Sequence, residues 1–228
     1  MMIGIIAAME SEMSILREEL HCEEIERIAG MRYYVGDADG KKIMLVQSGV
    51  GKVNSSMAAT ILIHHFGCSF ILNTGIAGGL LGVHPKDIVL ASNLIYSDVD
   101  ATGFGYQLGQ VPGMPLCYMP NMQVIIQFKR ILNRLGLAYK EGTIYTSDSF
   151  ITTKDNLKVE PKGDVAIVEM EGAAIAQVCT RFGVDYMVIR YVSDIVDEPS
   201  QIEDYKKFEI AMAERSNKIC LEIIRNME

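Results

Sequence analysis

The sequence predicts an α/β fold with a mixed, largely central β-sheet. Apolar runs of strand length alternate with longer segments of helical periodicity over most of the 228 residues, a pattern typical of a sheet covered by helices. Two or three adjacent strand-like runs have no helix between them, which indicates a mixed sheet. No linker or charge block divides the chain, so we expect residues 1–228 to form a single domain around one core.

The expected strands share a continuous or alternating apolar pattern. They are Met2–Ala8, Met31–Gly36, Lys42–Gln47, Ser69–Asn73, Asp87–Ile95, Glu141–Thr146, Asp164–Val168 and Tyr186–Val192. The expected helices carry apolar residues at i, i+3 and i+4. They are Glu10–Leu20, Lys52–Phe66, Met122–Leu135, Gly172–Phe182 and Asp204–Asn226, the last with Phe208, Met212, Ile219 and Ile223 on its apolar face. The long segment Ser97–Cys117 is rich in Gly and Pro, and such a loop is usually functional or an interface.

Composition limits the classes of partner. The formal net charge of −8 argues against nucleic acid or an anionic membrane as the main partner, although an uncharged nucleoside remains compatible with it. We expect neither a signal peptide nor a membrane span, because the N-terminus lacks a basic region and no apolar run reaches 18 residues. The five cysteines include no C-x-x-C, which indicates reduced thiols in a cytoplasm. The four histidines lack metal-binding spacing, so we expect no structural zinc.

Two carboxylates lie where an expected strand passes into a helix, in the stretch Val168–Ala174. Ligands of open α/β sheets bind at the carboxyl ends of strands. A carboxylate in the first turn of a helix is favoured by the helix dipole, so we expect it to be ionised. Glu169 and Glu171 would then suit binding of sugar hydroxyls or stabilisation of a developing cation, or they mark an ordinary acidic helix start.

Three further charged residues lie at or near strand ends. Asp194 follows an apolar strand, where burial would raise its pKa and make it a general acid, or it caps the next segment. Arg190 lies inside that apolar strand and needs a partner, which Glu12 or Glu171 could provide. Glu12 itself follows the first strand, where a surface helix start would explain it equally well.

Two glycine-rich segments resemble phosphate-binding loops only superficially. Gly49–Lys52 is not a P-loop, because Val46 replaces the first glycine of that motif and Val53 replaces its Ser or Thr; we expect a tight turn. Gly75–Gly79 is not G-x-G-x-x-G, because its third position is Ala77. It indicates a close approach of the backbone to a ligand or to another element.

Aromatic residues complete the set of candidates. Phe104, Tyr106 and Tyr205 could be core residues, whereas Phe150 follows a polar turn after a strand, which favours the wall of a site. Acidic residues, glycines and aromatics thus recur just beyond strand ends. Cleavage of a glycosidic bond requires such a set: an acid for the leaving group, a base for water, and negative charge near an oxocarbenium ion.

Seven motifs, in this order and spacing, resemble the 5'-methylthioadenosine/S-adenosylhomocysteine nucleosidases of the nucleoside phosphorylase superfamily. They are GIIAAMESEM, SGVGKVNSS, NTGIAGG, DATGFGYQLGQVPG, SDSFI, VEMEGAAIAQV and RYVSD. The resemblance runs nearly end to end. It implies a three-layer, nucleoside phosphorylase-like fold with a partly barrel-like sheet, a homodimer, and hydrolysis of adenine thio-nucleosides without a metal or a cofactor.

The same resemblance implies roles for the charged residues. Asp194 would be the general acid that protonates N7 of adenine, with Ser193 orienting it. Glu12 would be the base that activates water, assisted by Arg190. Glu171 would hold the ribose hydroxyls and favour the cationic transition state.

Substrate contacts are implied for three parts of the nucleoside. Phe150 would stack on adenine, the Ile151 backbone would read the base edge, and Met170 would pack on the ribose. The remaining contacts would come from the 5'-thio pocket (Met9, Val50, Tyr205), the NTGIAGG motif (Ile76, Ala77, Gly78) and the partner subunit's long loop (Phe104, Tyr106, Pro112).

Ile76 departs from the family pattern, which has a small hydroxyl residue there to help hold the nucleophilic water. We expect altered 5' selectivity, a slower reaction or loss of hydrolysis. A milder departure is Ala101, smaller than the usual valine at the interface.

Three alternatives therefore stay open. Phosphorolysis is disfavoured, because Glu10 and Glu12 would repel phosphate from the N-terminal loop. The others are a nucleoside-binding module without catalysis and a hydrolase for a different 5' substituent.

Overall fold

The computed structural model describes residues 1–227, apart from the side chains of residues 208–210, 212 and 213, so Phe208 and Met212 lie outside the described side chains. The strands are β1 (Met2–Ala7), β2 (Glu23–Ile28), β3 (Met31–Ala38), β4 (Lys41–Gln47), β5 (Phe70–Leu81), β6 (Ile88–Tyr96), β7 (Lys140–Thr146), β8 (Ala166–Glu169) and β9 (Asp185–Ile195). The helices are α1 (Ser14–Glu19), α2 (Lys52–His64), α3 (Met122–Arg134), α4 (Gly172–Phe182) and α5 (Gln201–Asn226). Short 3₁₀ turns are η1 (Glu10–Glu12), η2 (Thr102–Phe104) and η3 (Lys154–Asn156).

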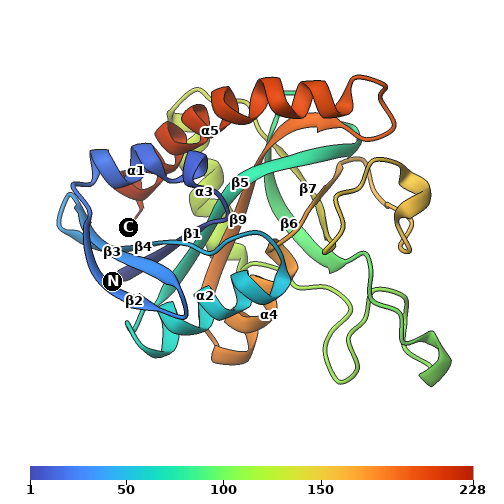
Figure 1. Cartoon of the computed structure of the whole chain (residues 1–228), viewed down its shortest axis with the longest axis horizontal. Helices are drawn as coiled ribbons and strands as arrows, with labels where there is room; N and C mark the ends of the chain where they lie inside the picture. The colour runs from blue at the N-terminus through green and yellow to red at the C-terminus, as the bar shows by residue number, and fades with distance from the viewer. Residues whose placement is uncertain (228) are drawn as a thin grey trace.

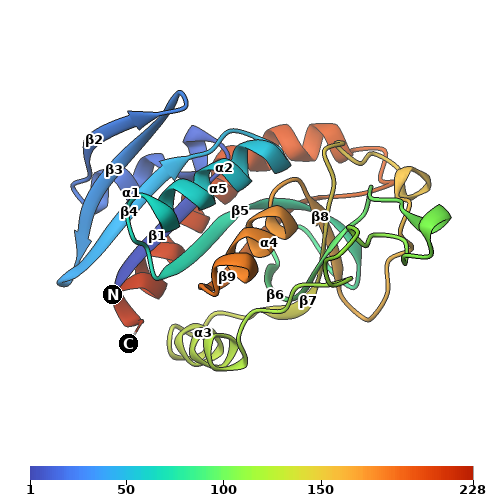
Figure 2. The same cartoon turned by 90° about the horizontal axis from the view of Figure 1, so that it is seen from below.

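All strands of the described chain join one mixed sheet, in the order β2-β3-β4-β1-β5-β8-β7-β6-β9. Strand β5 also pairs with β9, which closes β5, β8, β7, β6 and β9 into a barrel. The remaining strands form an open, twisted extension beside β5. This arrangement confirms the prediction of a mixed, partly barrel-like sheet, and Figures 1 and 2 show β5 running from the open part into the closed part.

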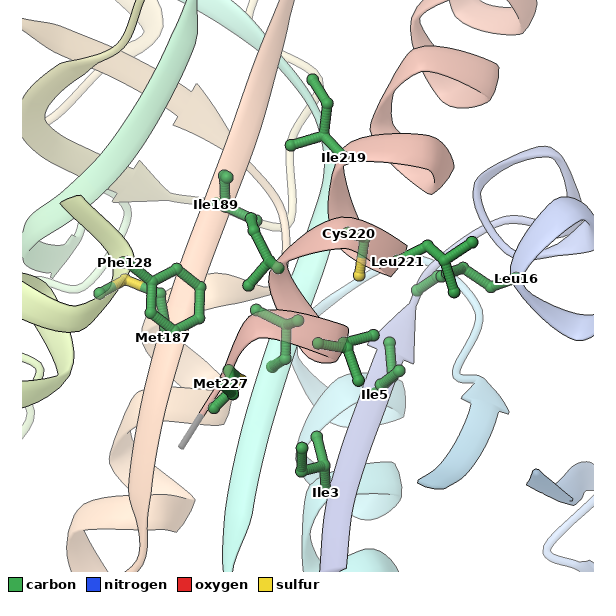
Figure 3. Close-up of a cluster of buried hydrophobic side chains, with 14 of the residues drawn as sticks. Ile3, Ile5, Leu16, Phe128, Met187, Ile189, Ile219, Cys220, Leu221 and Met227 are labelled. Carbon is green, nitrogen blue, oxygen red and sulfur yellow. The ribbon is translucent and has the colours of Figure 1, made fainter. Parts of the chain in front are cut away.

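Helices cover both faces of the sheet, as the three-layer prediction requires. Helices α1, α3 and α5 share one buried apolar cluster with β1 and β9; Figure 3 shows Ile5, Leu16, Phe128, Ile189 and Leu221 converging there. Helices α2 and α4 pack in a second cluster against the opposite face, and Figure 1 places them on the other side of the sheet from α5.

Two predictions were wrong: the single helix Glu10–Leu20, and the end of the strand Ser69–Asn73. The chain forms η1, breaks at Met13 and continues as the short helix α1, so Glu12 lies in a separate turn. The strand expected at Ser69–Asn73 continues to Leu81 as β5. Glycines permit this extension because neighbouring elements press on the strand: a Cβ at Gly79 would lie 2.6 Å from Ile195 Cδ1.

Strand β2 was not predicted. Its sequence, EEIERI, is largely charged, and the strand lies exposed at the sheet edge, paired only with β3 among the described strands. Strand β9 extends three residues beyond its predicted end, so Ser193 and Asp194 lie inside it rather than after it.

The long loop between β6 and α3 has only the short turn η2. Figure 2 shows this green segment projecting from the body of the molecule. Phe104, near its tip, is 85% exposed. Among residues 1–227, no helix is both long and apolar enough to cross a membrane.

Candidate active site

A pocket lies where several strands end, and most of the predicted site residues line it. The predicted residues that the structure brings together there are Met9, Glu12, Val50, Ile76, Ala77, Gly78, Phe150, Ile151, Met170, Glu171, Ser193, Asp194 and Tyr205. Sequence reasoning did not place Ala8, Ser149, Val168 and Gln201 in the site, although they line the pocket, and it considered Glu169, which also lines the pocket, only as one of two carboxylates at the helix start. Phe104, Tyr106 and Pro112 do not line the pocket of their own chain.

Glu12 is held rigidly by backbone N–H groups. The amides of Ala8 and Met9 each donate to Oε2 over 3.0 Å, and the amide of Ile76 donates to Oε1 over 3.1 Å. The side chain is only 2% exposed, so the alternative of a surface helix start is wrong. Gly75 allows this approach, because a Cβ there would lie 2.7 Å from Oε1 of Glu12.

Burial raises the pKa of Glu12, while the charge of Arg190 and the three backbone hydrogen bonds act against that rise. A fixed carboxylate with a raised pKa can accept a proton from water, so this residue has the properties of a general base.

Asp194 is buried inside β9 and is held by neutral donors. The hydroxyl of Ser193 donates to Oδ1 over 2.5 Å, and the amide Nε2 of Gln201 donates to Oδ2 over 2.9 Å. Burial raises the pKa of Asp194, and these two hydrogen bonds oppose the rise. Because the residue lies within a strand, the alternative of a helix cap is wrong. A raised pKa is suited to proton donation.

Arg190 is buried in β9 behind the pocket wall. It forms an ion pair with Glu169, donates to Asn73 Oδ1 over 2.6 Å, and lies 3.7 Å from Glu171 Oε2. The sequence predicted Glu12 or Glu171 as the partner of Arg190. In the structure Glu171 forms only a longer contact with the guanidinium, and the close partner is Glu169. Glu12 interacts with Arg190 through charge, without an ion pair of contact length.

Glu169 also occupies the N-terminus of α4. Its carboxylate accepts hydrogen bonds from the amides of Glu171 and Gly172 and from Thr146 Oγ1. The carboxylate that meets the helix dipole is thus Glu169, whereas sequence reasoning gave that role to either glutamate. The sequence signal for this role was the position of Glu169 directly after the predicted strand Asp164–Val168 and just before the predicted helix.

Glu171 lies in a different environment from the one predicted. Its Oε1 accepts from the amide of Gly51 over 2.9 Å. Burial, and then the neighbouring charge of Glu169, raise the pKa of Glu171 to about 8, with Arg190 acting in the opposite direction. Burial and the neighbouring carboxylate therefore oppose the ionisation that the helix start led us to expect for Glu171.

Aromatic and thioether side chains form another part of the pocket. The rings of Phe150 and Tyr205 meet edge to face, with centroids 5.4 Å apart. The hydroxyl of Tyr205 donates to Met9 Sδ over 3.7 Å. Apolar and sulfur surface of this kind suits a flat base or a thioether group.

No three His, Cys, Asp or Glu side chains within the described residues are grouped in a way that could hold a metal ion.

The glycine turn before α2 is a tight strand-to-helix turn, as predicted, with positive φ at Gly49 and Gly51. Its amides face carboxylates: Gly51 donates to Glu171 and Lys52 donates to Asp148.

The fold and pocket define the class of protein. The phosphorylase superfamily is the family whose model matches the chain, over residues 2–225. A curated relative, the 5'-methylthioadenosine/S-adenosylhomocysteine nucleosidase of Geobacillus kaustophilus, is 40% identical over 235 residues, covering 100% of this chain and 98% of the relative. The chain therefore belongs to the family of 5'-methylthioadenosine/S-adenosylhomocysteine nucleosidases, which confirms the resemblance.

Solved structures agree with this assignment. The S-adenosylhomocysteine nucleosidase of Streptococcus pyogenes, solved with 5-methylthiotubericidin, has a TM-score of 0.93 and 38% identity, covering 100% of this chain and 98% of its own. A futalosine hydrolase mutant of Helicobacter pylori has a TM-score of 0.92 and 29% identity, covering 99% of both chains. The fold is thus shared by hydrolases named for different nucleosides.

Proposed function

We propose that the chain hydrolyses the N-glycosidic bond of 5'-methylthioadenosine and S-adenosylhomocysteine and releases adenine. The observation that carries the proposal is a single pocket whose lining includes the buried carboxylates of Glu12 and Asp194, each fixed by hydrogen bonds and each with a raised pKa. Asp194 protonates the leaving adenine, and Glu12 accepts a proton from the attacking water. Residues 1–228 act as one nucleosidase domain.

In the proposed mechanism the C1'–N9 bond breaks and its electron pair goes to adenine. Asp194, oriented by Ser193, gives its proton to N7, so the base leaves as a neutral molecule. Water attacks C1' and passes a proton to Glu12, with the charge of Arg190 limiting how far the pKa of that base rises. General acid and base catalysis of this kind contributes roughly 10²- to 10⁴-fold for each group.

The ribosyl group lies between Glu171 and Met170 in this proposal. Glu171 binds the ribose hydroxyls, and the negative charge gathered around it favours an oxocarbenium-like transition state. Its raised pKa adds a condition, since the carboxyl must lose its proton before it supplies full charge.

The base and the 5' substituent occupy the remaining surfaces. Phe150 stacks on adenine and the backbone of Ile151 reads the base edge, while Met9, Val50 and Tyr205 surround the 5'-thio group. These residues line the same pocket.

We also propose that the enzyme is a cytoplasmic homodimer. Phe104, Tyr106 and Pro112 would complete the partner's site, because their loop projects from the body and Phe104 is largely exposed. Phe104→Ala should then raise KM at high protein concentration without lowering the free energy of unfolding of one subunit.

The function is tested by adenine release from 5'-methylthioadenosine in phosphate-free buffer and again with phosphate. Release without phosphate, together with free methylthioribose, supports hydrolysis. Turnover that requires phosphate would make the protein a phosphorylase, and tight nucleoside binding without turnover would make it a binding protein.

A hydrolase with a different preferred 5' substituent is the second candidate, favoured by Ile76. This side chain lines the pocket beside Glu12, where its branched apolar shape changes the space open to ligand and water. Comparing kcat/KM among adenine nucleosides that differ only at the 5' position separates the two candidates.

A further inference from the structure

We propose that Gln201 is a positioning residue that fixes the general acid Asp194 and the base-reading backbone of Ile151 relative to one another. The inference rests on the proposed function and extends it to a residue for which the sequence gives no signal. Gln201 would act through these two groups and need not touch the reacting atoms.

The contacts of Gln201 join three elements. It is the first residue of α5 and is only 4% exposed. Its Nε2 donates to Oδ2 of Asp194 in β9 and to the carbonyl oxygen of Ile151, after β7, over 2.9 Å in both cases. One nitrogen therefore holds two acceptors from distant parts of the chain.

This shared nitrogen sets the spacing of the two groups proposed to read adenine. A purine is rigid, so its N7 and its outer edge can meet Asp194 and Ile151 together only if those groups keep a fixed separation. Preorganisation of this kind improves catalysis because a small misplacement of reacting groups costs much of the rate. Loss of Gln201 should therefore lower kcat as well as raise KM.

Both oxygens of Asp194 receive a neutral donor, Ser193 on Oδ1 and Gln201 on Oδ2. A hydrogen bond to a carboxylate favours its charged form, so Gln201 opposes the effect of burial. A charged neighbour, Asp204 on α5, also acts on Asp194 and raises its pKa. Removing the amide should therefore make Asp194 hold its proton to higher pH and donate it less readily.

The experiment measures kcat and KM for 5'-methylthioadenosine across pH in the full-length protein, comparing Gln201→Leu with Ser200→Ala. Ser200 is the matched control: it precedes Gln201 at the start of α5, and its hydroxyl donates to Asp204 rather than to Asp194. We expect Gln201→Leu to lose about tenfold in kcat and to shift the alkaline limb of the profile upward by about 1 pH unit, the size of one hydrogen bond to a charged group. Ser200→Ala should leave both close to the wild type.

Two further variants keep the test independent of folding defects. Gln201→Glu preserves the shape of the side chain but places a second carboxyl beside Asp194, so the limb should move upward at least as far. Asp204→Asn removes a negative charge and should move the limb downward.

An unchanged alkaline limb in both Gln201 variants, or an equal shift in Ser200→Ala, would overturn the inference while leaving hydrolysis intact. A wild-type protein that releases no adenine would instead overturn the proposed function.

Discussion

The two ends of the pocket hold their carboxylates in different ways. At the base end, Asp194 is held by a hydroxyl and an amide, both neutral. At the ribosyl end, Glu12, Glu169 and Glu171 surround Arg190 and draw further hydrogen bonds from backbone amides. Among the described residues near this end, carboxyl groups outnumber the guanidinium.

This difference matches the chemistry proposed for each end. Neutral donors hold a carboxyl group in place without compelling it to stay charged, which suits a residue that must carry and give up a proton. Clustered carboxyl groups cannot all ionise easily, as the raised pKa of Glu171 shows, but the charge they do carry favours a cationic ribosyl group. Changes at the base end should therefore act mainly on the rate and its pH profile, whereas changes at the ribosyl end should also act on stability and its pH dependence.

The largest expected effect is that of Asp194→Asn. The amide preserves the size of the side chain but has no proton to give, so kcat should fall by about 10³-fold, within the range of general acid catalysis. Circular dichroism and thermal unfolding should remain close to the wild type. Full activity in this variant would refute the acid assignment.

Glu169→Gln should mainly affect stability. The change removes the charge that pairs with the buried Arg190 and weakens the acceptor at the N-terminus of α4. Breaking a buried ion pair costs about 3 kcal/mol or more in the free energy of unfolding, measurable by denaturant titration.

The matched control for that variant is Glu24→Gln. This exposed carboxylate lies 3.6 Å from Arg27 and 3.9 Å from Arg32, a type of pair that contributes about 1 kcal/mol at most. Equal losses in the two variants would show that the buried pair is not special.

Glu171 should make the protein less stable as pH rises. Its pKa in the folded state is about 8, above the ordinary value of 4.5, so the folded state binds this proton more tightly than the unfolded state. The resulting stabilisation is complete below pH 4.5 and is lost as pH rises to about 8. Between pH 5 and pH 8, the free energy of unfolding should fall more steeply in the wild type than in Glu171→Gln. Parallel curves would contradict the proton assignment.

The sequence predicted the fold where local pattern and burial agree. Helix α4 has the predicted bounds, Gly172–Phe182, because its apolar spacing is unambiguous. Strand β2 was missed because an exposed edge strand can be charged along its length. The end of β5 was missed because glycines that accommodate neighbouring groups look, in the sequence, like the end of a strand.

In the site, too, features set by local sequence could be predicted, whereas features set by distant contacts could not. Motifs identified most of the residues that line the pocket, and several of these residues, such as Met9, Phe150 and Met170, follow a strand. Their pairing depends on contacts between distant segments: Arg190 meets Glu169 and Asn73, and Gln201 meets Asp194. No local pattern encodes such contacts, so the raised pKa of Glu171 could not be inferred from its position at a helix start.

The smallest expected effect concerns Ile76, whose backbone amide already binds Glu12 while its side chain faces the pocket. Ile76→Ser and Ile76→Ala remove similar volume and should lose similar stability, about 2–4 kcal/mol. Only serine adds a hydroxyl beside the water proposed at Glu12. We expect kcat for 5'-methylthioadenosine to be about fivefold higher in Ile76→Ser than in Ile76→Ala, the value of one hydrogen bond. Equal rates would show that Ile76 acts through the shape of the pocket alone, and the 5' preference of the two variants would then differ from that of the wild type in the same way.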